Sequence, residues 1–351
     1  MQAILDRFKG HGHVSVLAGA NIVVLVLLAI GLGSSFFSMN NMQSMMTQVA
    51  EFGLLAVAMS LAMLTGGIDL SIVATAVLAG IVGAEFLTGK VVDLATTPAP
   101  VVMAMAVAAM LITGLLCGLF NGLLIAKASI PPILATLATS IFYTGVGTVM
   151  TGGASVPVKV KEFFKLGTVT VANIPMVFLI TVIAFVVVGM MLRWTRTGRR
   201  IYLYGENAIA LRFSGARHER LVILTYAIVG LICALAAMIM VSRTASARVG
   251  YGEAYLLQAI LVVVLAGFDP FGGRGRVSGL ALSLILLQLL SSAFTIMRFG
   301  PYMKVFIWGA MLLAVMLVTR IMAGFMERRE RAHVAPPGSG GSPAVVEAVS
   351  A

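Results

Sequence analysis

A single carboxylate interrupts a long apolar stretch of the sequence. Asp69 stands in LTGGIDLSIVATAVLAG, which begins at Leu64. It is two positions after the pair Gly66 and Gly67 and two positions before Ser71. An unpartnered charge in apolar surroundings is costly, so this carboxylate needs either a polar ligand or a structural partner. The two glycines predict a break between helices, where Asp69 and Ser71 accept hydrogen bonds from the free amides of the next helix. We favour this capping role over direct contact with a solute.

A second polar group follows at the end of a later apolar run, in GLFNGLLIAKASIPPILATLATS. Asn121 lies near the end of that run, and Pro131 with Pro132 prevents a helix from continuing through the segment. Thr136 and Thr139 come next, and threonine hydroxyls in membrane helices commonly bond to the preceding turn. The segment is either a plain turn between helices or part of a solute pathway. The candidates for a pathway or a helix break are therefore Gly66, Gly67, Asp69, Ser71, Thr75, Asn121, Thr136 and Thr139.

A third stretch, GYGEAYLLQAILVVVLAGFDPFGGRGRVSG, is rich in glycine and carries Asp269 and Arg274. These two side chains either pair with each other, or Asp269 caps the following turn. GGRGR lacks the spacing and the Lys-Ser/Thr of a Walker A motif, so we do not expect nucleotide to bind there. LAMLTGGID (61–69) and LVVVLAGFD (261–269) share Leu, Gly and Asp at matching positions, an echo that chance explains at least as well as an internal repeat.

The composition assigns these residues to a membrane protein. Of 351 residues, 60% are hydrophobic and 11% charged, with a mean hydropathy of +1.05, whereas a soluble domain has about 25% charged residues. A helix needs about 20 apolar residues to cross a bilayer, and these runs are too long for the strands of a barrel. The sequence therefore predicts an all-α, polytopic transmembrane bundle of about ten spans, at 15–36, 48–65, 70–88, 100–126, 132–150, 174–193, 220–242, 254–268, 277–297 and 303–325.

The distribution of positive charge orients the predicted bundle. The net charge is +11, and the basic residues lie in the loops and tails, which indicates membrane topology rather than nucleic-acid binding. With both termini cytoplasmic, sixteen of the 24 Lys and Arg residues fall on the inner side. The predicted parts are a cytoplasmic segment 1–14, a transmembrane domain 15–325 with an outer loop 151–173 (a short helix or hairpin) and a cytoplasmic loop 193–220, and a disordered cytoplasmic tail 326–351.

Cysteine and histidine offer no further chemistry. Cys117 and Cys233 both lie inside apolar runs, which predicts reduced, buried packing residues. The histidines lie outside the runs, so we expect neither a metal site nor intramembrane catalysis; they are His11, His13, His218 and His333.

The cytoplasmic loop carries a short predicted helix. Gly205, Glu206 and Asn207 form a plausible helix start, and the helix then ends at Gly215. A short helix with an apolar face in such a loop either lies on the membrane surface or docks into a partner protein.

Taken together, four motifs resemble the permease subunit of bacterial ABC importers for sugars. The motifs are TGGIDLS, NGLLIAKxxIPPxxATLxT, TRTGRRIYLYGENxxxLRFSG and VVVLAGxxxxxGGRGRVSG, and they occur in this order between about residues 45 and 322. The group includes ribose, xylose, arabinose, galactose and autoinducer-2 permeases. In that family the matching loop is a coupling helix that fits a groove on the ATPase. Here this implies a docking role for Gly205, Glu206, Asn207, Ala208, Arg212, Ser214 and Gly215, with Glu206 and Leu211 departing from the usual glycine and alanine.

The resemblance also implies partners. Two permease copies or paralogues form the pore in the bacterial inner membrane, ATPase subunits bind ATP and Mg, and a periplasmic binding protein delivers the sugar. The chain itself is then no enzyme, holds no cofactor, and contacts membrane lipid. Ile72 to Thr75 stands where the family commonly has a smaller Val-Gly-Ser; if this segment lines the pathway, the solute is expected to differ from the usual pentoses and hexoses. Two alternatives stay open: a secondary transporter driven by an ion gradient, whose ionisable candidates are Glu51, Asp69 and Glu85, and an ABC permease for a non-sugar solute such as an amino acid.

Overall fold

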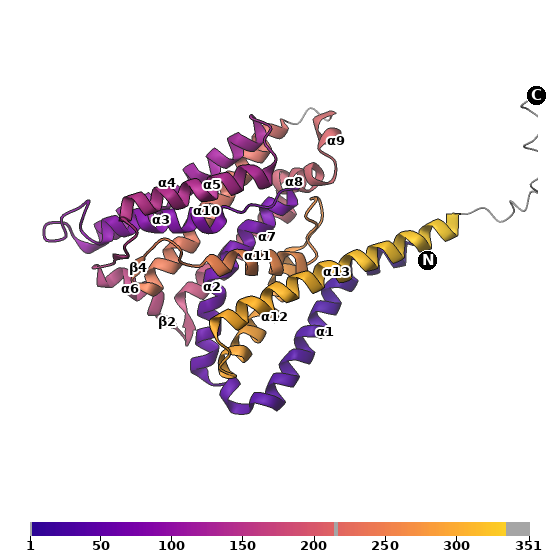
Figure 1. Cartoon of the computed structure of the whole chain (residues 1–351), viewed down its shortest axis with the longest axis horizontal. Helices are drawn as coiled ribbons and strands as arrows, with labels where there is room; N and C mark the ends of the chain where they lie inside the picture. The colour runs from indigo at the N-terminus through magenta and orange to yellow at the C-terminus, as the bar shows by residue number, and fades with distance from the viewer. Residues whose placement is uncertain (1, 214–216, 335–351) are drawn as a thin grey trace, which may run out of the picture. The chain divides into compact units, whose positions relative to one another are not determined.

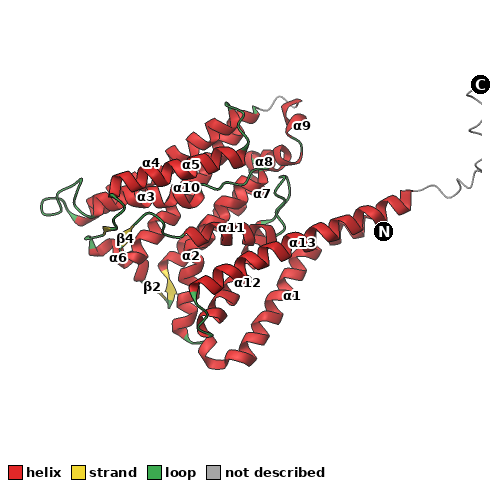
Figure 2. Ribbon diagram, in the orientation of Figure 1, coloured by secondary structure: helices red, strands yellow, loops and turns green. Residues whose placement is uncertain are grey.

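The computed structural model describes residues 2–213 and 217–334. These residues form a helical bundle (Figures 1 and 2), with four two-residue strands in the described connections. The elements are α1 Gln2–Phe36, α2 Met39–Leu64, α3 Ile72–Leu87, α4 Ala99–Ala126, α5 Pro132–Thr151, β1 Val156–Pro157, α6 Lys161–Thr168, β2 Thr170–Val171, β3 Ile174–Pro175, α7 Met176–Trp194, α8 Arg196–Glu206, α9 Ala208–Phe213, α10 His218–Thr244, β4 Ser246–Ala247, α11 Glu253–Leu265, α12 Val277–Ile296 and α13 Pro301–Val334.

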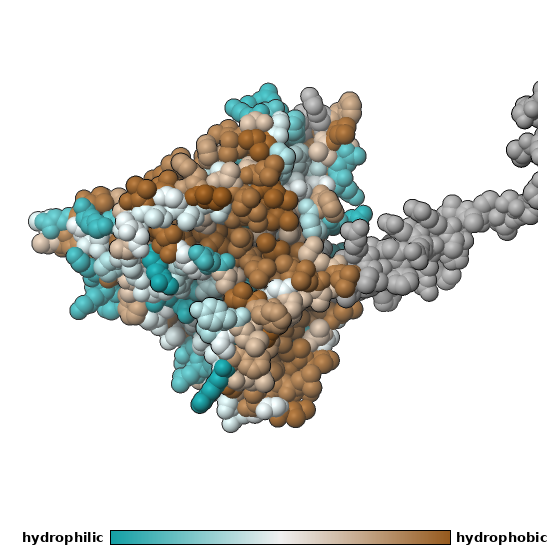
Figure 3. Space-filling view, viewed as in Figure 1, coloured by the Kyte–Doolittle hydropathy of each residue, from teal (hydrophilic) through white to brown (hydrophobic). Residues whose placement is uncertain are grey.

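Ten apolar helices coincide with the ten predicted runs. Within the described residues, seven of them are long and apolar enough to cross a membrane, and three are shorter: Ile72–Leu87, Glu253–Leu265 and Pro301–Leu317. The polytopic helical class is therefore confirmed, whereas ten crossings and the side of the termini stay predictions. Apolar side chains cover much of the face seen in Figure 3, as expected for a surface that meets lipid.

Small residues bring α4 and α10 into backbone contact. Gly114, Gly118 and Gly122 follow one another at four-residue intervals on α4, the spacing that lets membrane helices approach closely. A Cβ on Gly118 would lie 2.2 Å from the carbonyl oxygen of Tyr226, and one on Gly114 would lie 2.4 Å from that of Gly230. Any larger side chain would separate the helices, so these glycines fix the position of α4 and of the polar residue Asn121 that it carries.

Proline and glycine define the ends of α5. The helix begins at Pro132, where the missing amide costs nothing, and ends at Gly152, whose left-handed conformation (φ 61°) stops it. The predicted interruption at Pro131 and Pro132 is therefore confirmed.

The connection at 151–173 contains both predicted motifs. It holds the short helix α6, and it continues into a hairpin in which Thr170 pairs with Pro175 and Val171 with Ile174. In addition, β1 pairs antiparallel with β4, with Val156 opposite Ala247. This long-range pair ties the connection to the end of α10.

Two further expectations have definite outcomes. Cys117 and Cys233 are both free and buried, as predicted. The end of α13 at Val334 differs from the predicted disordered tail: residues 326–334 continue the helix, and the rest of that tail lies outside the described residues. Residues up to Trp308 form one compact unit, to which everything below refers.

Candidate functional site

The break between α2 and α3 is organised by Asp69. The carboxylate oxygen Oδ1 accepts hydrogen bonds from the Ser71 amide at 2.8 Å and from the Ser71 hydroxyl at 2.6 Å. Asp69 is 1% exposed. The predicted cap is thus confirmed for Asp69, which satisfies an amide that the helix leaves free. The predicted cap is wrong for Ser71, because its side chain accepts no hydrogen bond from an α3 amide. The Ser71 hydroxyl instead donates to Asp69 and accepts from Asn121.

Helices α4 and α5 hold this break from the other side. Asn121 Nδ2 donates to the Ser71 hydroxyl at 2.7 Å, and the Tyr143 hydroxyl donates to the Cys117 carbonyl at 3.0 Å beside Asn121. On α5, Thr136 Oγ1 accepts a hydrogen bond from the Leu70 amide at 3.1 Å. The structure therefore brings residues from two separate sequence motifs into one buried polar network.

The remaining candidates in this group pack rather than line a cavity. A Cβ on Gly67 would lie 2.6 Å from Pro132 Cβ, so only glycine fits between the break and the start of α5. Thr139 donates to the Thr136 carbonyl at 3.2 Å, the predicted back-bond. Thr75 is buried in the first turn of α3. Within the single chain these residues shape the break.

A junction of glycines joins the break to the 193–220 loop. A Cβ on Gly205, near the end of α8, would lie 2.0 Å from the Leu64 carbonyl oxygen and 2.2 Å from the Gly273 amide nitrogen. The Gly273 amide donates to the Leu64 carbonyl at 3.1 Å. A Cβ on Gly272 would lie 2.7 Å from the Gly66 amide nitrogen. We call Gly66, Gly205, Gly272 and Gly273 the glycine junction.

The turn that follows α11 completes this junction. Asp269 Oδ1 accepts from the Phe271 amide at 2.9 Å, which confirms capping of the turn as its role. Tyr202 on α8 donates to the Gly275 carbonyl at 3.0 Å. The sequence echo has a structural counterpart, because the side chains of Asp69 and Asp269 each accept a hydrogen bond from the backbone amide two residues later. The GGRGR segment therefore forms a turn that packs against the helix break. Its sequence did not indicate that it would contact TGGID.

The 193–220 loop carries two helices. Thr195 caps α8 by accepting from the Gly198 amide at 3.0 Å, and Asn207 Oδ1 caps α9 by accepting from the Ala210 amide at 2.9 Å. The predicted start is confirmed at Asn207, which directly precedes Ala208, the first residue of α9. Gly205 and Glu206, which the sequence also assigned to this start, instead lie in the last turn of α8. Ile209 is 70% and Phe213 88% exposed. Figure 1 shows α9 beyond α8 at the end of this loop.

The predicted docking residues also include Arg212, Ser214 and Gly215. The backbone of Arg212 lies in α9. Ser214 and Gly215, and with them the predicted helix end, lie outside the described residues.

A buried ion pair lies away from this junction, and the sequence did not predict it. Glu51 on α2 is 1% exposed and pairs with Arg243 Nη1 on α10 at 2.8 Å. The hydroxyl of Tyr251 donates to Glu51 Oε1 at 3.3 Å, and that of Tyr255 donates to Oε2. Two features of the sequence could have indicated this cluster. Glu51 is an ionisable residue inside an apolar run, and Tyr251 and Tyr255 are spaced four residues apart.

The three carboxylates that the sequence placed inside spans have protein partners. Glu51 bonds to Arg243 and two tyrosines, Asp69 bonds to Ser71, and Glu85 pairs with Lys90 Nζ at 2.9 Å. Each charge is accounted for by a structural contact.

Seven of the described helices are long and apolar enough to cross a membrane, and the break between α2 and α3 packs against the 193–220 loop, as expected for a multi-pass membrane protein. Residues 41–316 match the family described as branched-chain amino acid transport system / permease component. The chain is 33% identical over 303 residues to the ribose import permease protein of Escherichia coli K12, covering 85% of this chain and 91% of that relative. It is 29% identical over 336 residues to the fructose import permease protein of Rhizobium meliloti, covering 91% and 88%.

A third relative is the autoinducer 2 import system permease protein of Yersinia enterocolitica, 28% identical over 307 residues, with 84% of this chain and 89% of the relative covered. No solved structure matches the chain. The protein belongs to the branched-chain amino acid transport system / permease component family.

Proposed function

We propose that this chain is the pore-forming permease subunit of an ABC importer in the bacterial inner membrane. The solute is a sugar or sugar-like polar molecule that a periplasmic binding protein delivers. The observation that carries the proposal is the similarity to a ribose import permease across 85% of the chain, which includes all four sequence motifs. The chain is a transporter subunit, and a separate ATPase supplies energy by binding ATP and Mg.

The α9 helix is the proposed ATPase contact. Its exposed apolar residues, Ile209 and Phe213, are available to enter a groove on a partner protein. The Asn207 cap holds the helix start in place. With both termini cytoplasmic, the 193–220 loop faces the ATPase, and a second copy or a paralogue completes the pore.

The glycine junction is the proposed route for movement. A displaced α9 moves α8, and Gly205 transmits that movement to the end of α2 because their backbones are in contact. The break at Asp69 and Ser71 then lets α3 reorient relative to α2. Alternating access follows from this relation, with the break residues acting as a hinge beside the pathway.

Two alternatives make different predictions. A secondary transporter needs an ionisable group free to exchange a proton or ion within the bundle, and Glu51, Asp69 and Glu85 are each already partnered. An ABC permease for an amino acid shares the architecture and differs only in the solute.

Reconstitution separates these possibilities. Proteoliposomes with the permease, its ATPase and its binding protein are expected to import D-ribose or D-fructose only with internal ATP. Uptake without any ATPase, driven by an ion gradient, would contradict the ABC assignment. Uptake of leucine in place of either sugar would keep the ABC mechanism and replace the solute class.

A surface substitution tests the α9 contact. Phe213→Glu puts a charge in the apolar face and is expected to abolish co-purification with the ATPase. Val171→Glu is the matched control. Val171 is also exposed, but it lies on the hairpin of the 151–173 connection, the predicted outer loop. Equal ATPase recovery with the two variants would rule out α9 as the contact.

A further inference from the structure

A cavity separate from the helix break lies between α3, α5 and the segment that leads into α11. Its volume is about 250 Å³. By the same measure a single water needs about 10–15 Å³, so the space admits a solute much larger than water. Its walls include Val73 and Val77 of α3, Ser140 and Thr144 of α5, and Tyr251 and Glu253 near the start of α11.

The polar wall offers mainly hydrogen-bond acceptors. Thr144 donates its proton to the Ser140 carbonyl at 2.8 Å, which leaves the hydroxyl oxygen free to accept. Ser140 adds a hydroxyl, and Glu253 adds a carboxylate, which only accepts when ionised. None of the lining residues is a lysine or arginine. Such a wall suits a solute with several hydroxyl donors and disfavours an anion.

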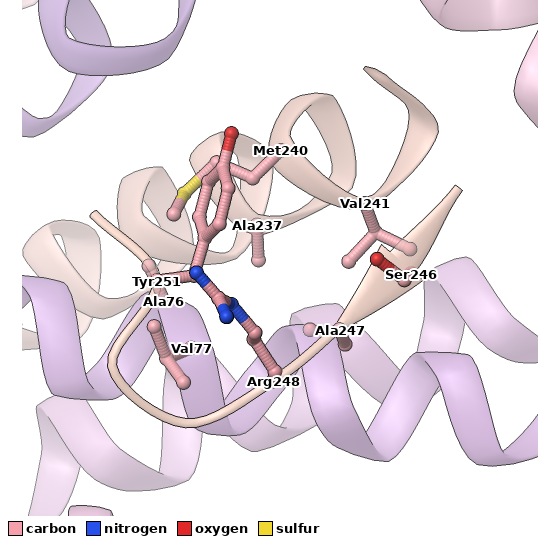
Figure 4. A pocket seen from close by; sticks show the side chains of 10 residues that line it. Ala76, Val77, Ala237, Met240, Val241, Ser246, Ala247, Arg248 and Tyr251 are labelled. Carbon is pink, nitrogen blue, oxygen red and sulfur yellow. The ribbon is translucent and has the colours of Figure 1, made fainter. Parts of the chain in front are cut away.

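The aromatic wall is held in place from outside the cavity. The Tyr251 hydroxyl donates to Glu51, which is itself held by Arg243 and Tyr255. The hydroxyl is thus engaged by Glu51, and the ring supplies apolar atoms to the cavity wall. Figure 4 shows Tyr251 and Arg248 beside Ala76 and Val77 in the adjoining cavity. The volume of that cavity is about 10 Å³, so it holds no more than about one water. Tyr251 thus lines both the cavity of about 250 Å³, which can hold a solute, and the cavity of about 10 Å³, which cannot.

We propose that the cavity between α3, α5 and the α11 approach is a transient binding site for a neutral monosaccharide, with Tyr251 held in place by Glu51. This deepens the proposed function and rests on it. An aromatic face combined with convergent acceptors matches the two surfaces of a sugar ring, one formed by C–H groups and the other by hydroxyls. Glu51 acts on the solute only through Tyr251 and is a positioning residue.

Two threonines on one helix provide the first test. Thr144 and Thr148 are both exposed, both donate to the carbonyl four residues earlier at 2.8 Å, and only Thr144 lines the cavity. In proteoliposomes with the ATPase and binding protein, Thr144→Trp is expected to reduce D-ribose and D-fructose import to background. Thr148→Trp should import like the wild type. Binding-protein-stimulated ATP hydrolysis should persist in both, which shows that the variants fold and couple.

Milder variants cover the case in which tryptophan disrupts folding. Thr144→Val with Ser140→Ala removes two polar contacts and is expected to lower sugar import about twofold to tenfold at unchanged ATP hydrolysis. Tyr251→Phe frees the ring from Glu51 and should raise KM for import. Wild-type import kinetics in Thr144→Val/Ser140→Ala would overturn the site.

The same assay distinguishes failure of the site from failure of the function. If the wild type imports a neutral sugar and all cavity variants match it, the site is wrong and the ABC assignment stands. If the wild type imports D-glucuronate and neither neutral sugar, the proposed solute class is wrong. If the binding protein stimulates no ATP hydrolysis in the wild-type complex, the proposed function itself fails.

Discussion

Gly205 and Leu64 meet backbone to backbone: a Cβ on the glycine would stand 2.0 Å from the leucine carbonyl oxygen. They lie at the ends of α8 and α2, far apart in sequence, and the Gly273 amide bonds to the same carbonyl. Because no side chain separates the two helix ends, movement of one displaces the other directly. The relation links the proposed ATPase contact to the hinge.

Replacing Gly205 by alanine should uncouple the two helices. The added methyl group has no room, so α8 must shift away from α2. Sugar import and binding-protein-stimulated ATP hydrolysis are expected to fall together, while basal hydrolysis persists. The control is Gly145→Ala on α5, where nothing lies within 4 Å of the added carbon. Normal stimulation in Gly205→Ala would remove the glycine junction from the coupling route.

The Asn207 cap should determine how well α9 binds its partner. Asn207→Ala leaves the Ala210 amide without its acceptor, a loss of about 0.5–2 kcal/mol. ATPase affinity should weaken by about twofold to thirtyfold. Asn207→Asp keeps an acceptor and adds a charge that the helix dipole favours. Titration of the ATPase onto immobilised permease measures both, and equal weakening by the two changes would show that capping is irrelevant.

Asn121 should contribute to the stability of the bundle. Asn121→Leu removes the amide that bonds to Ser71 and leaves that hydroxyl without its donor, at a cost of about 1–3 kcal/mol. Thermal unfolding in detergent is expected to begin at a lower temperature. Leu116→Ala, on an exposed position of the same helix, should have a much smaller effect. If the two variants unfold alike, the polar network does not hold the break.

Replacing Arg243 should destabilise the protein more than replacing Glu51. Arg243→Gln leaves a carboxylate that is 1% exposed without its counter-ion, and breaking a buried pair in this way costs about 3–5 kcal/mol. Glu51→Gln leaves an arginine whose side chain is 28% exposed, so water can hydrate it at smaller cost. The double variant should unfold at a higher temperature than Arg243→Gln alone. Equal losses from the two single changes would contradict this explanation.

Local chemistry made much of the molecule predictable. Hydrophobic run length identified ten apolar helices because a helix in lipid must satisfy its own backbone and present apolar side chains. Turn chemistry identified the Asp69 cap, the Pro132 start and the Asn207 start, since each depends on neighbours within a few residues. The continuation of α13 past residue 326 was missed because the tail's composition carries no apolar periodicity.

The contacts between motifs depended on tertiary structure. The sequence predicts a helix break at TGGID, a helix start at YGEN and a turn near FGGRGR. Nothing in the spacing of these motifs indicates that Gly66, Gly205 and Gly273 meet. Likewise Glu51 and Arg243 lie on different helices, and helix packing alone makes them neighbours. The sequence by itself determined which segments form helices and where they end, because those are short-range interactions. Only the packing of α2, α8 and α11 decided which ends touch, since close backbone approach depends on the position of every helix in the bundle.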